Sequence, residues 1–559
     1  MNRSINPWGF RWSMAPAAAV FATAVFAAEG AAPRPVADFR VILTDDGVLS
    51  FTDLEPQRSE AALRAMIRSL QTSPVKTLVY EVAAGSQVMF YLTKVGSVWG
   101  WRKAGAEAEA AWVKRIPINR AAAASGLDAV RTAGSEAKAM GMYFMPGYRI
   151  NDAHFAHEPM RNVLTGEFWL KHHERLALGT SPIPGDNRYQ HLFDFSHPEV
   201  REHSLAVIYE IIDRYADIMD GLQLDFMRHP VFFSAGTAPA RSSLMTDLVF
   251  AVRQRLDVSG RRAGRFLALS VRVPPTLATC RGAGLEVEQW IARQLVDVVI
   301  PAPSITLSHD LPVDEFAALA TPRGVKIYPA LFPRTQFHWP IVRSPAAKNY
   351  AGTTGRDVSE AHVRGAVRNY LSMGAAGFEL YNFNLPPEAV ASAAFNALAS
   401  PHHGDRVYAI TPAYYAEREG TFEYRKQIPA ALSPETPADL TIVIGEDLTK
   451  ADLRRANSAT LRLGLHGLGK AKGRFLIEMN AHRVYEGDGG AVMTPVSGRE
   501  SRPSRMHPPA TQVYLQVRLT DGGIFHPGRN RLVVRLQSPN AAANLQIVEA
   551  QIAVLDNAP

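Results

Sequence analysis

DGLQLDFMRHP, residues 220–230, is the stretch of sequence that decides the fold. Its two leucines and Phe226 alternate with other residues, so a strand here has one apolar face and carries Gln223 and Asp225 on the opposite face. Asp-Gly before the strand and His-Pro after it are turn signals, which predict a short buried strand. A carboxylate at the end of such a strand is typical of an active site on a parallel α/β barrel. A structural Asp that caps the next helix is the alternative.

Similar strand-like runs recur along the chain and alternate with helical sequence. The segment SHPE at 196–199 has the form of a capping box and predicts a helix that leads directly into residues 220–230. Strict alternation predicts a parallel sheet, and eight units favour a closed (β/α)8 TIM barrel over 36–400 rather than an open doubly wound sheet. No glycine-rich dinucleotide or phosphate-binding fingerprint follows any strand, which further disfavours the open sheet. The eight strands begin near residues 39, 75, 142, 221, 266, 296, 325 and 377.

Period-two strands replace the helical pattern after the segment PHHG at 401–404. Turns rich in Gly, Pro and Asn separate these strands, which predicts a C-terminal antiparallel β-sandwich of the jelly-roll type over 405–559. The run HPGRNRLVV at 526–534 resembles the turn and strand of galactose-binding-like jelly rolls.

The N-terminus has the form of a secretory signal peptide, predicted over residues 1–28. Arg3 and Arg11 precede an alanine-rich apolar run, and small residues near Ala28 offer a cleavage site. The run is shorter than the roughly twenty residues that a membrane-spanning helix needs, so an uncleaved anchor is the alternative. We therefore expect an exported protein with no membrane span beyond this segment.

The composition is that of a globular protein, with 47% hydrophobic and 20% charged residues among 559. The net charge of +7 comes from 60 basic and 53 acidic residues, and the basic residues are scattered, which argues against nucleic acid as a partner. The single Cys280 excludes an intrachain disulfide and a cysteine zinc site. No motif indicates a cofactor, and the sequence does not give the oligomeric state.

Polar residues gather at the predicted carboxyl ends of the barrel strands, where the reactive groups of such barrels lie. Asp225 and Glu379 are the candidate catalytic residues. Trp169, in the long excursion after the third strand, offers an aromatic face for a sugar, with simple packing as the alternative. The other candidate substrate-binding residues are Glu81, Arg149, Asn151, Asp152, His154, Arg228, His229, Arg272, Tyr381 and Asn382.

Two carboxylates from different strands that face one cleft are the minimal equipment for hydrolysis of a glycosidic bond. Arg228 is close to Asp225 in sequence, and a nearby cation would keep that carboxylate ionised. Glu379 lies between Phe378 and Leu380, an apolar setting that would raise its pKa. We therefore interpret Asp225 as the nucleophile or base and Glu379 as the acid, with a purely structural role as the alternative for each. No His-Glu-x-x-His motif occurs, and no catalytic metal is predicted.

Four segments in one order carry a family resemblance: RINDAH at 149–154, EFWLKHHE at 167–174, FDFSHPEVR at 193–201, and residues 220–230. This succession resembles the family-10-like glycosyl hydrolases, which are exported barrels, and the similarity spans roughly residues 38–400. The resemblance implies a (β/α)8 glycosidase-like fold and a carbohydrate substrate, without naming the sugar.

One departure concerns the second carboxylate. Retaining barrels of this kind place their carboxylates after strands four and seven, whereas Glu379 follows the eighth predicted strand. Either the first strand is miscounted or the second carboxylate is not the usual one. The alternative from another class is a noncatalytic glycan-binding or cell-surface scaffold protein on the same barrel, in which Asp225 and Glu379 need not face each other.

Overall fold

The computed structural model describes most of the chain, and Pro35–Pro559 form one compact unit. The predicted signal segment at 1–28 lies outside the described residues, as does His154. The described ranges are 34–45, 59–85, 87–101, 120–152, 164–181, 189–303, 307–335, 356–383, 389–411, 427–449, 453, 459–468, 473–488, 491–492, 513–538 and 544–556.

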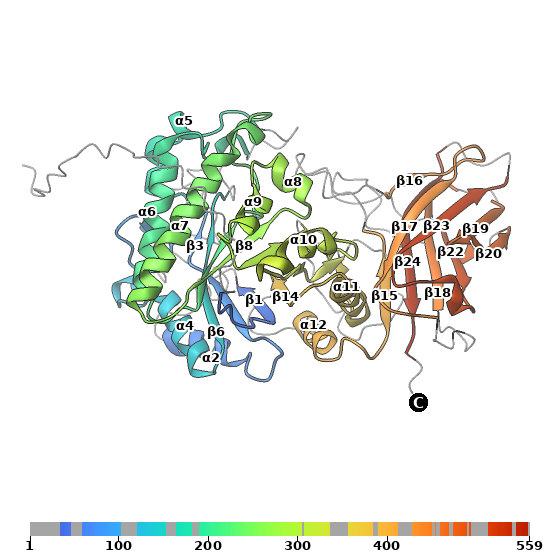
Figure 1. Ribbon diagram of the computed structural model, residues 1–559, viewed down its shortest axis with the longest axis horizontal. Coiled ribbons are helices and arrows are strands. Elements are labelled where there is room, and N and C mark those ends of the chain that lie inside the picture. The colour runs from blue at the N-terminus through green and yellow to red at the C-terminus, as the bar shows by residue number, and fades with distance from the viewer. Residues whose placement is uncertain are drawn as a thin grey trace, which may run out of the picture. The chain divides into compact units, whose positions relative to one another are not determined.

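Nine strands between residues 41 and 381 form one parallel sheet (Figure 1). Their order is β10-β9-β8-β7-β6-β2-β1-β14-β11, and every neighbouring pair is parallel. The predicted alternation of strands and helices around a parallel sheet is confirmed, and the arrangement is that of an α/β barrel. The strands are β1 (Val41–Asp45), β2 (Thr77–Glu81), β6 (Tyr143–Arg149), β7 (Gly221–Asp225), β8 (Ala268–Val273), β9 (Val298–Pro301), β10 (Lys326–Ile327), β11 (Ala330–Leu331) and β14 (Phe378–Tyr381).

The two end strands of this sheet, β10 and β11, come from one short segment of chain. Pro329 lies between them and has no N–H to donate, so the hydrogen-bond ladder is interrupted there. As a result β10 pairs with β9, whereas β11 pairs with β14. Because one segment carries both ends, the sheet must curl.

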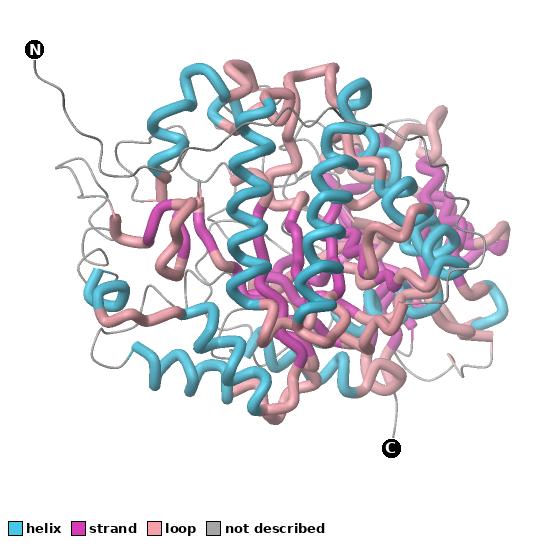
Figure 2. The backbone as a smooth tube through the Cα atoms, turned by 60° about the vertical axis from the view of Figure 1, so that its left-hand side comes forward, coloured by secondary structure: helices cyan, strands magenta, loops and turns pink. Residues whose placement is uncertain are grey.

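Helices follow the strands along the chain and flank the sheet (Figure 2). The helix α6 begins at Pro198, within the segment 196–199 that was predicted to start it, but its N-cap is His197 and makes no side-chain cap hydrogen bond. The predicted capping box is therefore wrong, and the Ser196 N–H instead donates to Asp194 Oδ1. The described helices are α2 (Ser59–Arg68), α4 (Ala129–Ala139), α5 (Glu167–Leu176), α6 (Pro198–Tyr215), α7 (Ser242–Arg262), α8 (Leu277–Gly282), α9 (Val287–Ala292), α10 (Val313–Ala320), α11 (Glu360–Ser372) and α12 (Ala389–Ala399).

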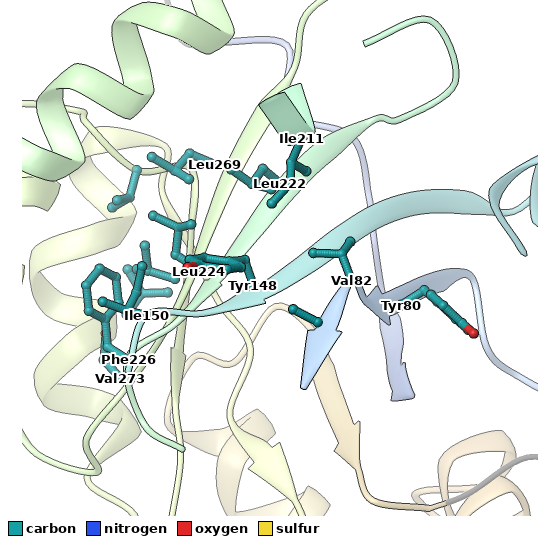
Figure 3. Close-up of a cluster of buried hydrophobic side chains, with 14 of the residues drawn as sticks. Tyr80, Val82, Tyr148, Ile150, Ile211, Leu222, Leu224, Phe226, Leu269 and Val273 are labelled. Carbon is teal, nitrogen blue, oxygen red and sulfur yellow. The ribbon is translucent and has the colours of Figure 1, made fainter. Parts of the chain in front are cut away.

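Two hydrophobic clusters lie on the two faces of the parallel sheet. Leu222 and Leu224 of β7 belong to the larger cluster, which also contains helix residues such as Ile211 (Figure 3). The smaller cluster contains Ile42 of β1 and Tyr381 of β14, and it fills the inner side of the curled sheet. Because side chains alternate along a strand, the face of β7 opposite its leucines points to this inner side.

The described residues from 406 onward form two antiparallel sheets. One has the order β15-β24-β18-β22-β21, with β16 paired to β24, and the other has the order β17-β23-β19-β20. A single hydrophobic cluster contains residues of both sheets, such as Leu463 of β18 and Val534 of β23. The strands are β15 (Arg406–Ala409), β16 (Ala430–Ala431), β17 (Ala438–Ile444), β18 (Ala459–His466), β19 (Phe475–Met479), β20 (His482–Gly487), β21 (Ala491–Val492), β22 (Val513–Arg518), β23 (Gly528–Leu536) and β24 (Gln546–Val554).

The predicted turn at 526–530 leads into β23 and is fixed by one buried side chain. Asn530 Oδ1 accepts the His526 N–H at 3.0 Å, and Asn530 Nδ2 donates to the carbonyls of His526 and Gly528. Gly528 has a φ of 97°, which an L-residue rarely adopts, so glycine is required at this position of the turn.

Two smaller sheets complete the described strands. The strands β3 (Ala83–Ala84), β4 (Val88–Met89) and β5 (Ser97–Val98) form a three-stranded sheet directly after β2. The strands β12 (Arg334–Thr335) and β13 (Arg356–Asp357) pair with each other. Within the described ranges, none of the helices combines the length and the apolar character needed to cross a membrane.

Candidate active site

Asp225 ends β7 on the inner side of the curled sheet and is 1% exposed. Its Oδ1 accepts the backbone N–H groups of Met227 at 2.8 Å and Arg228 at 2.9 Å, which fixes the carboxylate at the turn after the strand. The register of the sheet places Asp225 beside Arg272 of β8. Arg272 Nη1 lies 3.1 Å from Oδ1 and 3.0 Å from Oδ2 of Asp225.

Glu379 of β14 is fully buried and reaches the same guanidinium from the other side. Its Oε2 accepts Arg272 Nε at 2.9 Å, and its Oε1 accepts the Thr44 hydroxyl at 2.7 Å and Gln223 Nε2 at 3.0 Å. Burial raises the pKa of Glu379, while the charge of Arg272 and the hydrogen bond from Thr44 act in the opposite direction. The raised pKa agrees with the prediction made from its apolar neighbours in the sequence.

Arg272 therefore joins the two candidate catalytic carboxylates. Burial works to lower its pKa, but the charges of Asp225 and Glu379 outweigh burial and raise it, so the guanidinium stays protonated. Its Cζ also lies 3.8 Å from the centre of the Tyr381 ring and 5.6 Å from that of Phe332, in cation–π contact. One cation thus contacts two buried carboxyl groups and compensates a single negative charge. A proton on Glu379 would make the group of three electrically neutral.

A second set of polar side chains extends this network from Tyr381. Arg149 Nη2 donates to the Tyr381 hydroxyl at 3.1 Å, and Arg149 Nη1 lies 3.4 Å from Asp152 Oδ2. His229 Nδ1 lies 3.4 Å from the other oxygen of Asp152. The Tyr381 hydroxyl is 3.5 Å from Asp225 Oδ2, a weak contact that completes the connection to the carboxylates.

The structure thus brings seven of the predicted residues into one continuous network, and it places the others elsewhere or in supporting roles. Asn151 Nδ2 donates to the carbonyls of Phe193 and Val231, so it ties two loops together. Trp169 packs within the α5 region, where its Nε1 donates to the His191 carbonyl and its ring stacks on His173. The network consists of Arg149, Asp152, Asp225, His229, Arg272, Glu379 and Tyr381.

Three further predicted residues lie close to the strand ends. Glu81 is fully buried at the end of β2 and faces Gly147, where a Cβ would lie 3.0 Å from Glu81 Oε1. Arg228 supports Asp225 through its backbone N–H. Asn382 follows β14 with a φ of 61°, a left-handed conformation that Asn tolerates better than most residues.

The sequence analysis did not predict the two side chains that donate hydrogen bonds to Glu379, or the guanidinium that pairs with Asp225. Thr44 and Gln223 hold Glu379, and the guanidinium that pairs with Asp225 belongs to Arg272, whereas Arg228 contributes its backbone N–H. The signal for Gln223 was present, because strand alternation puts it on the same face as Asp225. Among the residues that the structure describes, no three His, Cys, Asp or Glu side chains are grouped as a metal site requires.

No protein-family model matches the chain, and no curated protein matches it significantly. The solved structures that are similar to it include glycoside hydrolases. An α-L-fucosidase from Paenibacillus thiaminolyticus is 11% identical, with a TM-score of 0.38, over 65% of this chain and 49% of that one. A chitinase from a Paenibacillus species is 11% identical, with a TM-score of 0.38, over 92% and 56%.

A β-L-arabinopyranosidase from Geobacillus stearothermophilus is 11% identical, with a TM-score of 0.35, over 89% of this chain and 96% of that one. The chain spans about half the length of the first two enzymes. At TM-scores below 0.5, these similarities give neither a family nor an activity to the chain.

Proposed function

We propose that this protein is a glycoside hydrolase that acts on a poly- or oligosaccharide with Asp225 and Glu379 as its carboxylate pair. The observation that carries the proposal is the joint contact of both carboxylates with Arg272 on the inner side of the curled parallel sheet. Glycoside hydrolysis needs one carboxyl group that is protonated and one that is ionised. The surroundings of the two groups favour this division.

Asp225 is the nucleophile or the base in this proposal, because two backbone N–H groups and a guanidinium stabilise its anion. Glu379 is the acid, because burial raises its pKa. The acid would donate its proton to the leaving oxygen, while Asp225 would attack the sugar or activate water. The substrate would be contacted by Arg149, Asp152, His229 and Tyr381. Because both carboxyl groups are buried, the side chains that cover them would have to move when a sugar binds.

The burial of the carboxylates favours a second candidate, a noncatalytic glycan-binding or scaffold protein. Both carboxyl groups are almost inaccessible to solvent. A buried Asp–Arg–Glu group can have a purely structural role, in which it holds three strands together. In that case Asp225, Arg272 and Glu379 would be structural residues, and the protein would bind sugars without cleaving them.

The proposal extends to the architecture and the location of the protein. The position of β10 and β11 in one segment supports a closed (β/α)8 barrel over residues 36–400. The cluster shared by the two antiparallel sheets supports a jelly-roll sandwich over 405–559, of the galactose-binding-like type. The sequence of residues 1–28 supports export to the periplasm or the cell exterior after cleavage of a signal peptide.

A polysaccharide panel tests the proposed activity. The purified protein should release reducing ends from at least one plant, algal or bacterial polysaccharide. Asp225→Asn and Glu379→Gln should each lower turnover by about 100-fold or more, the usual effect of removing a general acid or base. If the wild-type protein binds a glycan from the panel but cleaves none, the proposed hydrolase activity is wrong and the noncatalytic glycan-binding function is favoured.

A further inference from the structure

A second site lies outside the carboxylate network, in a cavity of about 270 Å³. The cavity is formed where the small sheet β3–β5 meets the helices α5 and α6, and Gln87, Ser97 and Phe168 are among its lining residues. None of the residues that line it belongs to the Asp225–Arg272–Glu379 network. What binds there is therefore a separate question from what the carboxylates do.

Gln87 is the most informative residue of the cavity. The residue is 8% exposed, and its backbone has a φ of 67°, a strained conformation for a non-glycine residue that recurs at functional sites. Its Nε2 donates to the Tyr148 hydroxyl at 3.0 Å, whereas its Oε1 has no hydrogen-bond partner among the described residues. A buried amide oxygen without a partner is costly, so a ligand hydroxyl at this point would gain a strong hydrogen bond.

The wall of the cavity is aromatic and carries a second unpaired polar atom. The Phe168 ring stacks on His203, with ring centres 3.7 Å apart and planes 9° apart, and His172 lies 4.8 Å away. Burial lowers the pKa of His203 to about 4, so its imidazole is neutral at pH 7. Within the described part of the chain, His203 Nε2 is buried and makes no hydrogen bond.

The charges around the cavity indicate a neutral ligand. Lys171 Nζ and Glu167 Oε1 form an ion pair at 2.6 Å, so the cation and the anion of this wall compensate each other. A phosphate or a carboxylate would find no unopposed cation here among these lining residues.

The size of the cavity limits the ligand to a single small ring. Pockets for drug-sized ligands measure roughly 300 to 1,000 Å³, so a cavity of about 270 Å³ is suited to something smaller. An aromatic wall with a few placed polar atoms is the usual lining of a small-molecule pocket. A neutral ring that carries several hydroxyl groups can use both the apolar wall and the two polar atoms.

We propose that this cavity binds one neutral pyranose ring, whose hydroxyl groups pair with Gln87 Oε1 and His203 Nε2 against the wall formed by Phe168. The proposal does not require the barrel to be catalytic. In a hydrolase the cavity anchors the glycan at a second position, and in a scaffold protein it is the glycan-binding site itself.

Isothermal titration of the full chain with free neutral sugars tests this proposal. Glucose, galactose, mannose, xylose and fucose are the probes, and glucuronate and glucosamine are the charged comparators. At least one neutral sugar should bind with a dissociation constant of about 1 mM, as expected for about a dozen non-hydrogen atoms. His203→Phe keeps the stacked ring but removes both nitrogens, and it should weaken binding about tenfold, as should Gln87→Met.

His173→Phe is the matched control, because His173 also stacks on an aromatic ring, that of Trp169, and does not line the cavity. It should bind the sugar as tightly as the wild-type protein, and circular dichroism melts should show that all variants are folded. Three results would overturn the proposal: no neutral sugar binds up to roughly 20 mM, His203→Phe binds as tightly as His173→Phe, or glucuronate binds better than any neutral sugar. Turnover is not measured here, so the outcome is independent of the Asp225→Asn activity test.

Discussion

Replacement of Arg272 by Met removes the cation that joins the two candidate catalytic carboxylates. The guanidinium is 1% exposed and contacts Asp225 at 3.0 Å and Glu379 at 2.9 Å. Met fills much of the space of the Arg side chain but carries no charge. Because loss of one partner from a buried ion pair costs about 3 to 5 kcal/mol, and two carboxylates lose their partner here, we expect the upper part of that range.

The loss should also depend on pH in a defined direction. Without Arg272, the charge that opposes burial is gone, so the pKa of Glu379 rises further above its unfolded value of about 4. A carboxyl group with a raised folded pKa stabilises the fold most at acid pH, and this contribution is lost as the pH rises through the folded pKa. The variant should therefore be closest to the wild type near pH 4 and furthest from it near pH 8.

Urea unfolding followed by circular dichroism at pH 5 and pH 8 measures both effects. In the Arg272→Met background, the added changes Asp225→Asn and Glu379→Gln should restore most of the lost stability, because they remove the unpaired charges. Arg253→Met is the matched control, since Arg253 is also buried and also pairs with two carboxylates, Asp297 at 2.9 Å and Asp257 at 2.6 Å. It should lose stability without being rescued by those two changes. A loss below about 1 kcal/mol, or the absence of rescue, refutes the reasoning.

Three further predictions concern single side chains. Burial raises the pKa of Glu379, so the contribution of this group to stability is present at acid pH and is lost as the pH rises through its folded pKa. In urea titrations at several pH values, the stability of the wild type relative to Glu379→Gln should therefore fall as the pH rises from about 4.5, and a constant difference between the two proteins contradicts this prediction. Thr44→Val removes the hydroxyl 2.7 Å from Glu379 and should cost about 1 to 3 kcal/mol at pH 7 by the same assay, where a change within error argues against that hydrogen bond. Asn530→Ala should cost about 2 to 4 kcal/mol, because three backbone groups of the turn lose their partner, whereas the exposed Arg529→Ala should cost under about 1 kcal/mol in thermal melts.

Local patterns in the sequence predicted most of the fold. The alternation around residues 222–226 placed Gln223 and Asp225 on the inner face, because side-chain direction along a strand depends only on spacing. The split of the seventh strand was not predicted, although Pro329 is its physical cause. The capping box failed because Ser and Glu at the right spacing do not determine which residue becomes the N-cap.

The sequence predicted which residues belong to the candidate site better than it predicted the contacts among them. Strand-end position identified Asp225, Glu379 and Arg272, but the link among them depends on which strands are neighbours and in which register. That information is nonlocal, so sequence proximity pointed to Arg228 as the cation beside Asp225. The cavity beside Phe168 was not predicted for the same reason, since it combines separate parts of the chain. Two of its lining residues, Gln87 and His203, are more than one hundred positions apart in the sequence.

The Asp225 carboxylate is proposed to carry out chemistry, and comparison with a second buried Asp tests this role most directly. Asp297 is a matched control, because it is also buried, also accepts a hydrogen bond from a buried Arg, and lies before β9, at the opposite end of the strands from the candidate site. The measurement is kcat/KM per folded molecule for Asp225→Asn and Asp297→Asn on a polysaccharide that the wild type cleaves. We predict a loss of about 100-fold or more for Asp225→Asn and a value near wild type for Asp297→Asn. Equal activity of the two variants would contradict the account and leave Asp225 as a structural residue.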